Sequence, residues 1–234
     1  MDALTITQAG LLSDVERLRV LSHNLANATT LGFRRDVAVV RPFDTQLDQA
    51  SAGVSTTPVT DVDRTPGALR YSGNPLDVAL EGDGYFVLQS QAGAVFSRQG
   101  NFQLDSRGRL MGANGSAVLG ASGEVMLSQA EPRIDQAGGV WEGDKLVDTL
   151  RVVRFPADAQ LVSLGGGAYA SDAASLQDVE MPRVRQGYVE ASNVVPMREM
   201  VRLIETMRHF EASQRVVRSY DDMMDRAFSL LGEA

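Results

Sequence analysis

The chain has 234 residues, a formal net charge of −8, 44% hydrophobic and 22% charged residues, and no cysteine. This composition is typical of a folded globular protein, and the negative charge argues against a nucleic-acid-binding or anionic-membrane surface, which needs clustered positive charge. The absence of cysteine excludes disulfides, thiolate nucleophiles and cysteine metal sites.

No stretch of the sequence reaches the roughly 18 consecutive apolar residues of a membrane-spanning helix. The first residues lack the basic and apolar regions of a cleaved secretory signal. We therefore expect no membrane span and no cleaved signal.

Both ends of the chain carry leucine-type residues at a seven-residue spacing. Near the N-terminus these are Leu4, Leu11, Leu18 and Leu25, and near the C-terminus they are Leu203, Phe210, Val217, Met224 and Leu231. The spacing predicts amphipathic helices over residues 2–27 and roughly 196–231. Because the spacing is kept over four or five repeats, it favours coiled-coil pairing, either between the two ends or with neighbouring subunits.

The middle of the chain has a different pattern. Residues 36–75 are rich in proline, threonine, serine and aspartate, and this predicts an extended connector. Residues 76–188 alternate short apolar runs with turn pairs such as Arg107-Gly108, Asn114-Gly115 and Ser122-Gly123, and Asp83-Gly84 is of the same kind. This alternation predicts an antiparallel β domain.

The predicted fold class is α+β, with long N- and C-terminal helices forming a coiled-coil-like domain and an inserted antiparallel β domain. The predicted boundaries are 1–35 for the N-terminal helical part, 36–75 for the connector, 76–188 for the β domain and 189–234 for the C-terminal helical part.

The sequence contains no recognisable catalytic arrangement. His23 and His209 each fall within a predicted helix, where a lone histidine is more often a surface or interface residue than a metal ligand. Glu81 and Asp83 flank a glycine and are interpreted as solvated turn acids. No nucleophile, base and orienting group come together, so we expect no enzyme activity, metal or cofactor.

Three motifs occur in order along the chain. The first runs from Ser22 to Arg34 with the letters SHNLANATTLGFR, the second combines residues 75–86 (PLDVALEGDGYF) with residues 96–102 (FSRQGNF), and the third is residues 190–197 (EASNVVPM). Their characteristic residues are Ser22, Asn24, Leu25, Ala26, Asn27, Gly32, Phe33, Asp77, Gly82, Gly84, Phe86, Arg98, Gly100, Ser192 and Asn193.

These motifs resemble the signatures of the flagellar rod, hook and hook-associated axial proteins, and the resemblance covers nearly the whole chain. It implies a structural subunit of the basal-body rod whose terminal helices form the inner tube, whose β domain lies outside them, and which helps to transmit torque from motor to hook. It also implies passage through the flagellar export apparatus and assembly with itself and with other rod proteins in the periplasm. Residues 220–227 are closer to the proximal-rod type than to the distal-rod type.

Two local features add to this interpretation. Val195 precedes Pro196 where the family commonly has a polar cap, so we expect a weakly capped C-terminal helix, with Ser192, Asn193 or a neighbouring subunit supplying the acceptor. Phe43 and Leu47 resemble the short hydrophobic element by which early flagellar substrates engage the export gate, although an anchor on the β domain is an open alternative.

Two other functions remain open. The chain could be a distal-rod or other basal-body component. A secreted glycan-binding or hydrolytic β domain is a rival from another class, but it would need an aromatic platform or a convergent acid pair, and Trp141 is the only tryptophan.

Overall fold

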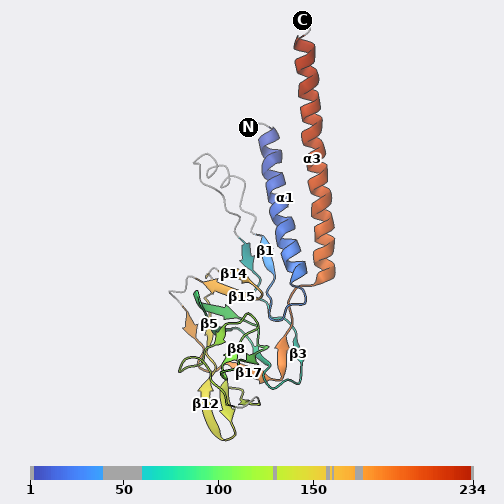
Figure 1. Cartoon of the computed structure of the whole chain (residues 1–234). Coiled ribbons are helices and arrows are strands. Elements are labelled where there is room, and N and C mark those ends of the chain that lie inside the picture. The colour runs from blue at the N-terminus through green and yellow to red at the C-terminus, as the bar shows by residue number, and fades with distance from the viewer. Residues whose placement is uncertain are drawn as a thin grey trace. The chain divides into compact units, whose positions relative to one another are not determined.

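The computed structural model of the chain describes residues 3–38, 60–128, 131–156, 159, 161–171 and 176–232. These residues form two helices and many short, mostly antiparallel strands (Figure 1). They divide into two compact units. The first takes its described residues from Met1–Ala26, Asp36–Thr60 and Val195–Ala234, and the second consists of Asn27–Arg35 and Asp61–Val194.

The first unit contains the helices α1 (Ala3–Ala26) and α3 (Pro196–Gly232) and the strand β1 (Asp36–Ala38). Both helices were predicted from their apolar spacing, and they lie side by side (Figure 1). A contact between His209 Nδ1 and Asp14 Oδ2, 2.5 Å long, joins them. Asn24 fixes β1 to the end of α1, since its side chain exchanges two hydrogen bonds of 2.8 Å with the backbone of Asp36.

The predicted fold class is wrong. Apart from these two helices, the regular structure consists of short, mostly antiparallel strands, and the helices do not bury the leucine seam that a coiled-coil-like domain requires. Along α1 the buried side chains of the described part are Asp14, Val20 and Asn24, and near the start of α3 Glu199 is buried. The β structure is also not confined to one inserted segment, because strands form between residues 36 and 75 as well, and the second unit includes residues 27–35.

The strands of the second unit are short and nearly all pair antiparallel. They are β3 (Leu69–Tyr71), β4 (Val78–Glu81), β5 (Tyr85–Ser90), β6 (Gly93–Ser97), β7 (Gln103–Leu104), β8 (Leu110–Met111), β9 (Ala117–Val118), β10 (Arg133–Ile134), β11 (Gly139–Glu142), β12 (Lys145–Thr149), β13 (Val152–Arg154), β14 (Leu161–Gly165), β15 (Ala168–Ser171), β16 (Gln177–Asp178), β17 (Arg183–Gln186) and β18 (Tyr188–Glu190); β2 (Thr60–Val62) precedes them. The largest sheet has the order β14-β15-β6-β5-β9-β8-β7, and β13 joins it by pairing with β5 and β16. Smaller sheets are β10-β11-β12, β17-β4 and β18-β3.

The strand β5 lies at the centre of the core and is buried on both faces. Phe86 and Leu88 belong to one apolar cluster, and Tyr85 and Val87 belong to the other. This alternation follows from the two-residue period of a strand. Edge-to-face ring contacts hold each side: Phe86 lies 5.2 Å from Phe102, and Tyr85 lies 5.8 Å from Tyr169, between ring centroids.

We expect Asp135 to make the second unit sensitive to acid. Burial alone would raise the pKa of Asp135, but hydrogen bonds from Trp141 Nε1 and from the amides of Gly139 and Ala137 outweigh it, so this pKa lies below its ordinary value. The resulting stabilisation is present above the unfolded-state pKa of about 3.9 and is lost as the pH falls through the lower folded-state pKa.

The test is the free energy of unfolding, followed by Trp141 fluorescence from about pH 5 to about pH 2, for the parent chain and for Asp135→Asn. We expect the parent chain to lose more stability than the variant over this range, because the amide side chain of the variant does not titrate. Two parallel curves would contradict the assignment.

Candidate functional site

A buried cluster of three charged side chains joins the three sequence motifs within the second unit. The Glu190 carboxylate, only 1% exposed, lies 2.6 Å from Arg34 Nη1 through Oε1 and 3.4 Å from Arg98 Nε through Oε2. Both guanidinium groups are buried as well. Arg34 comes from the first motif, Arg98 from the second and Glu190 from the third.

Backbone contacts position the Glu190 carboxylate between the two arginines. The Gly32 amide donates to the Glu190 carbonyl (2.8 Å), and the Gly67 amide donates to Oε1 of the same residue (2.8 Å). Arg34 Nη1 also donates to the Thr65 carbonyl, and Arg98 Nη2 donates to the Gly82 carbonyl. These contacts connect the segment of Glu190 to residues 32–34, 65–67, 82 and 98.

The cluster contains two positive charges and one negative charge. Burial lowers the pKa of Arg98, although the negative charge of Glu190 acts in the opposite direction. The 3.4 Å contact between Arg98 Nε and Glu190 Oε2 is an ion pair without hydrogen-bond alignment, and Arg98 Nη1 has no hydrogen-bond partner within the described residues. Removing the one carboxylate would leave both guanidinium groups buried without a counter-charge.

Two tyrosines complete the surroundings of the cluster. The Arg98 guanidinium lies over the Tyr85 ring, 5.7 Å from its centroid, and the Arg34 amide donates to the Tyr169 hydroxyl (2.9 Å). Burial raises the pKa of Tyr85, so its phenol stays protonated at neutral pH. Guanidinium groups are also permanently protonated, and the cluster therefore holds segments together rather than moving protons.

Asn193 of the third motif makes a second junction in this unit. Its Oδ1 accepts a hydrogen bond from the Arg35 amide (2.7 Å), and its Nδ2 donates to the carbonyls of Asp63 and Thr65 (3.0 Å each). Ser192 Oγ accepts from the Val194 amide (3.2 Å). Neither side chain caps α3 in these contacts.

The start of α3 instead relies on its backbone. The Val195 carbonyl accepts hydrogen bonds from the amides of Arg198 and Glu199, and Pro196 occupies the first helical position, where a missing amide hydrogen costs nothing. Glu199 supplies an acidic residue in the first turn, which the sequence interpretation did not consider.

The motif glycines mark close backbone approaches. A Cβ at Gly100 would lie 1.5 Å from the Val78 carbonyl oxygen, and a Cβ at Gly32, where φ is +62°, would lie 2.5 Å from the Arg98 carbonyl carbon. A Cβ at Gly84 would likewise lie 2.8 Å from the Val152 side chain. Each of these positions therefore excludes a side chain.

The other motif residues lie in the second unit or on α1 of the first unit. Phe33 and Phe86 are fully buried in the second unit, Asp77 bridges to Asn101, and the Gly82 carbonyl accepts from Arg98. Asn27 accepts hydrogen bonds from Thr30 just after α1. Ser22, Asn24, Leu25 and Ala26 lie on α1 in the first unit.

Arg34 and Glu190 stand within the sequence motifs but are not among the residues predicted to be characteristic of them, and the sequence offered no prediction for Tyr169. Charged residues are usually exposed, and nothing in the local spacing pairs position 34 with position 190. The one available signal was that both charges stand inside motifs.

The seven-residue seam predicted for polymer contacts is only half-buried. Leu11, Leu18, Leu25, Leu203, Phe210 and Val217 have intermediate exposure. The side chains of Leu4, Met224 and Leu231 lie outside the described part of the structure, as do Phe43 and Leu47 altogether. The assignment of these residues to polymer contacts or to export stays a prediction.

Both histidines bond to carboxylates: His209 to Asp14, and His23 Nδ1 to Asp36 Oδ2 at 2.7 Å. Among the described residues, no group of three or more potential metal-ligating side chains gathers in one place. Neither helix, over its described length, has a stretch apolar enough to cross a membrane.

Comparison with known proteins shows extensive similarity. Residues 185–230 match the family description "Flagellar basal body rod FlgEFG protein C-terminal", and residues 79–165 match "Flagellar hook protein FlgE/F/G D1 domain". The flagellar basal-body rod protein FlgF of Mesorhizobium japonicum is 30% identical, covering 99% of this chain and 98% of its own length. FlgF of Salmonella typhimurium is 33% identical over 99% of both chains, and FlgG of Buchnera aphidicola from Acyrthosiphon pisum is 28% identical over 97% of this chain and 99% of its own.

Proposed function

This chain belongs to the flagellar basal-body rod protein family and is a structural subunit of the rod, and we propose that it is a proximal-rod subunit that polymerises through its terminal helices. Three FlgF proteins are 30–33% identical to this chain, against 24–28% for the FlgG proteins compared with it, and this supports the proximal type. In this role the subunit helps to carry torque from the motor to the hook.

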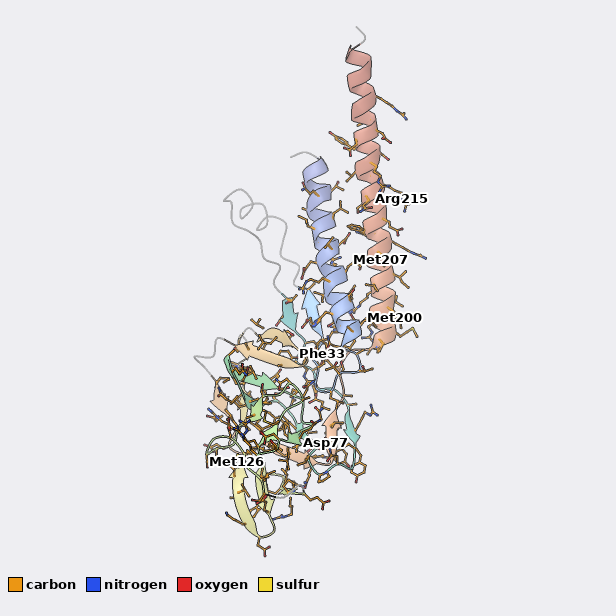
Figure 2. All side chains as sticks on the ribbon, viewed as in Figure 1. Phe33, Asp77, Met126, Met200, Met207 and Arg215 are labelled. Carbon is orange, nitrogen blue, oxygen red and sulfur yellow. The ribbon has the colours of Figure 1, made fainter. Side chains whose placement is uncertain are left out.

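An exposed apolar stripe on α3 is the observation that carries the proposed mode of assembly. Met197, Met200, Ile204 and Met207 are all exposed, and they recur at the three- and four-residue intervals of one helix face. Figure 2 labels Met200 and Met207 along this helix. On α1, Leu12 and Val15 are likewise exposed.

This stripe differs from the seam predicted from the sequence. The half-buried positions Leu203, Phe210 and Val217 lie roughly 100–140° around α3 from Ile204, at about 100° per residue, and they border the stripe at Met207, which is about 40° from Leu203. We infer that the seam residues serve mainly the contact between α1 and α3 and that the exposed stripe serves neighbouring subunits. Exposed apolar faces of this kind are typical of interaction surfaces.

Further parts of the proposal rest on the family alone. We propose that the chain leaves the cytoplasm through the flagellar export apparatus without a cleaved signal, that the rod it joins lies in the periplasm, and that it has no catalytic role. The domain boundaries predicted at residues 35, 75 and 188 stand as part of the same proposal.

Ile204→Asp tests the proposed mode of assembly. Ile204 is 52% exposed in the single chain, so the change costs the isolated protein little, but a carboxylate buried at each subunit contact costs several kcal/mol. We expect thermal melting of the second unit, followed by Trp141 fluorescence, to stay unchanged while rods fail to assemble and cells lose motility.

Ala212→Asp is the matched control, because Ala212 is also exposed on α3 but lies about 80° from Ile204 around the helix. This variant should swim. Normal swimming of Ile204→Asp would rule out the stripe as a subunit contact.

A further inference from the structure

The outward side of β17 and the chain just beyond it carry a row of large exposed side chains. Val184 points into the core, while its neighbours Arg183 and Arg185 are exposed. Met181, 85% exposed, precedes them, and the half-buried Tyr188 on β18 follows. Together with Tyr71 on β3, these residues form a surface that we call the Tyr–Arg strip: Tyr71, Met181, Arg183, Arg185 and Tyr188.

The aromatic end of the strip is exposed yet held in place. Tyr71 is 74% exposed and pairs in register with Tyr188 across the β18-β3 sheet. The two rings meet edge to face at 5.2 Å, and the Arg185 guanidinium lies 5.6 Å from the centre of the Tyr188 ring. Gly187, whose φ is +76°, lies against Tyr71, since a Cβ there would be in ordinary contact with the Tyr71 ring at 3.4 Å. A fixed, exposed tyrosine loses little conformational entropy when a partner covers it.

The other end of the strip borders a pocket of about 280 Å³. Leu80, Val152 and Pro182 supply apolar wall, and Arg154 and Arg183 also line the pocket. The volume suits one or two side chains of a partner rather than a large ligand.

Among the residues that the structure describes, the guanidinium groups of Arg154 and Arg183 in the pocket are not paired with a carboxylate. The neighbouring carboxylate of Glu81 is bound by Arg185, and that of Asp178 is bound by Arg151 at 2.8 Å. Within the described residues, no ion pair or hydrogen bond engages the side chains of Arg154 and Arg183, and Asp83 is the remaining acid of the lining. The pocket therefore favours an acidic side chain.

We propose that the Tyr–Arg strip is a contact surface for a second copy of this chain in the rod, with the pocket receiving an acidic side chain of that copy. Tyrosine, arginine and methionine are the residues enriched at the centres of protein interfaces. The strip is basic, whereas the chain as a whole has a net charge of −8, so a second copy supplies the complementary charge elsewhere on its surface. A contact between two different surfaces builds a ring when the rotation between copies closes and an open helical assembly when it does not, and a rod requires the open form.

This inference rests on the proposed function, and site-specific cross-linking in flagellated cells tests it separately. The variant Tyr71→p-benzoylphenylalanine is irradiated in cells, and the adducts are mapped by mass spectrometry. We expect an adduct of two copies of this chain, joined from residue 71 to an acidic surface outside the strip. If the bulky residue itself stops assembly, Tyr71→Cys with a photo-reactive thiol reagent replaces it, because the chain has no other cysteine.

Arg183→Glu in the same background should lower the yield of this adduct about tenfold or more, as expected for an interface-centre residue. Arg107→Glu, an equal change of charge at an exposed turn between β7 and β8, should leave the yield unchanged. Unchanged melting of both variants establishes that they fold.

Three results would overturn the proposal: no adduct in motile cells, an adduct with a different protein or with cell-wall glycan, or an adduct that joins one strip to another strip. The Ile204→Asp variant tests the subunit contact proposed for the α3 stripe independently of the strip. If that variant blocks assembly while residue 71 forms no adduct in motile cells, the strip proposal alone fails.

Discussion

Replacing Glu190 with alanine is expected to destabilise the second unit by about 3–5 kcal/mol, because it leaves two arginines buried without a counter-charge. The carboxylate is 1% exposed and bonds to Arg34 and to the Gly67 amide, while Arg98 faces its other oxygen at 3.4 Å. Neither guanidinium can lose its proton at neutral pH. Urea unfolding followed by the fluorescence of Trp141 measures the change.

Asp178→Ala is the matched control, since it also removes a carboxylate from an arginine, but on the surface. Arg151 and Asp178 are both exposed, and such pairs contribute about 0–1 kcal/mol. Glu190→Gln should fall between the two, because it keeps an acceptor for the Gly67 amide and loses only the charge. If Glu190→Ala is no less stable than Asp178→Ala, the buried cluster is not what holds the three motifs together.

The sequence predicted the local structure well. The periodic helices at both ends were found within one or two residues of their expected bounds, and the turn pairs at 107–108 and 114–115 join strands that pair with each other. The pair Asp83-Gly84 does not close a hairpin, since β4 pairs with β17 while β5 pairs with β6, β9 and β13. Turn residues specify a change of direction but not the partner of the next strand.

The long-range arrangement was not predictable from these patterns. A seven-residue repeat identifies one face of a helix but says nothing of how deeply that face is buried, and here Asp14, Asn24 and Glu199 are more buried than the leucines. The cluster around Glu190 joins residues more than 150 positions apart, and no local rule connects them. The motifs located the important residues, but only the structure shows which of them touch.

Replacing Gly32 with alanine should be nearly as damaging as the loss of Glu190. Gly32 has a φ of +62°, which costs an alanine about 1 kcal/mol. The added Cβ would also lie 2.5 Å from the Arg98 carbonyl carbon and 2.5 Å from the Gln99 amide nitrogen, and these are backbone atoms that cannot rotate away. Any shift of Gly32 also strains its 2.8 Å hydrogen bond to the Glu190 carbonyl, so we expect a total loss of about 3 kcal/mol or more.

Gly115→Ala separates the two causes, because Gly115 has a similar φ of +75° but no atom within 4 Å of an added Cβ. It should cost only about 1 kcal/mol, the conformational part of the penalty. The comparison uses the free energy of unfolding in urea for both variants and the parent chain. Equal losses would mean that the close approach of Gly32 to the Arg98 backbone does not constrain the first motif, and the junction would then depend on the charged side chains alone.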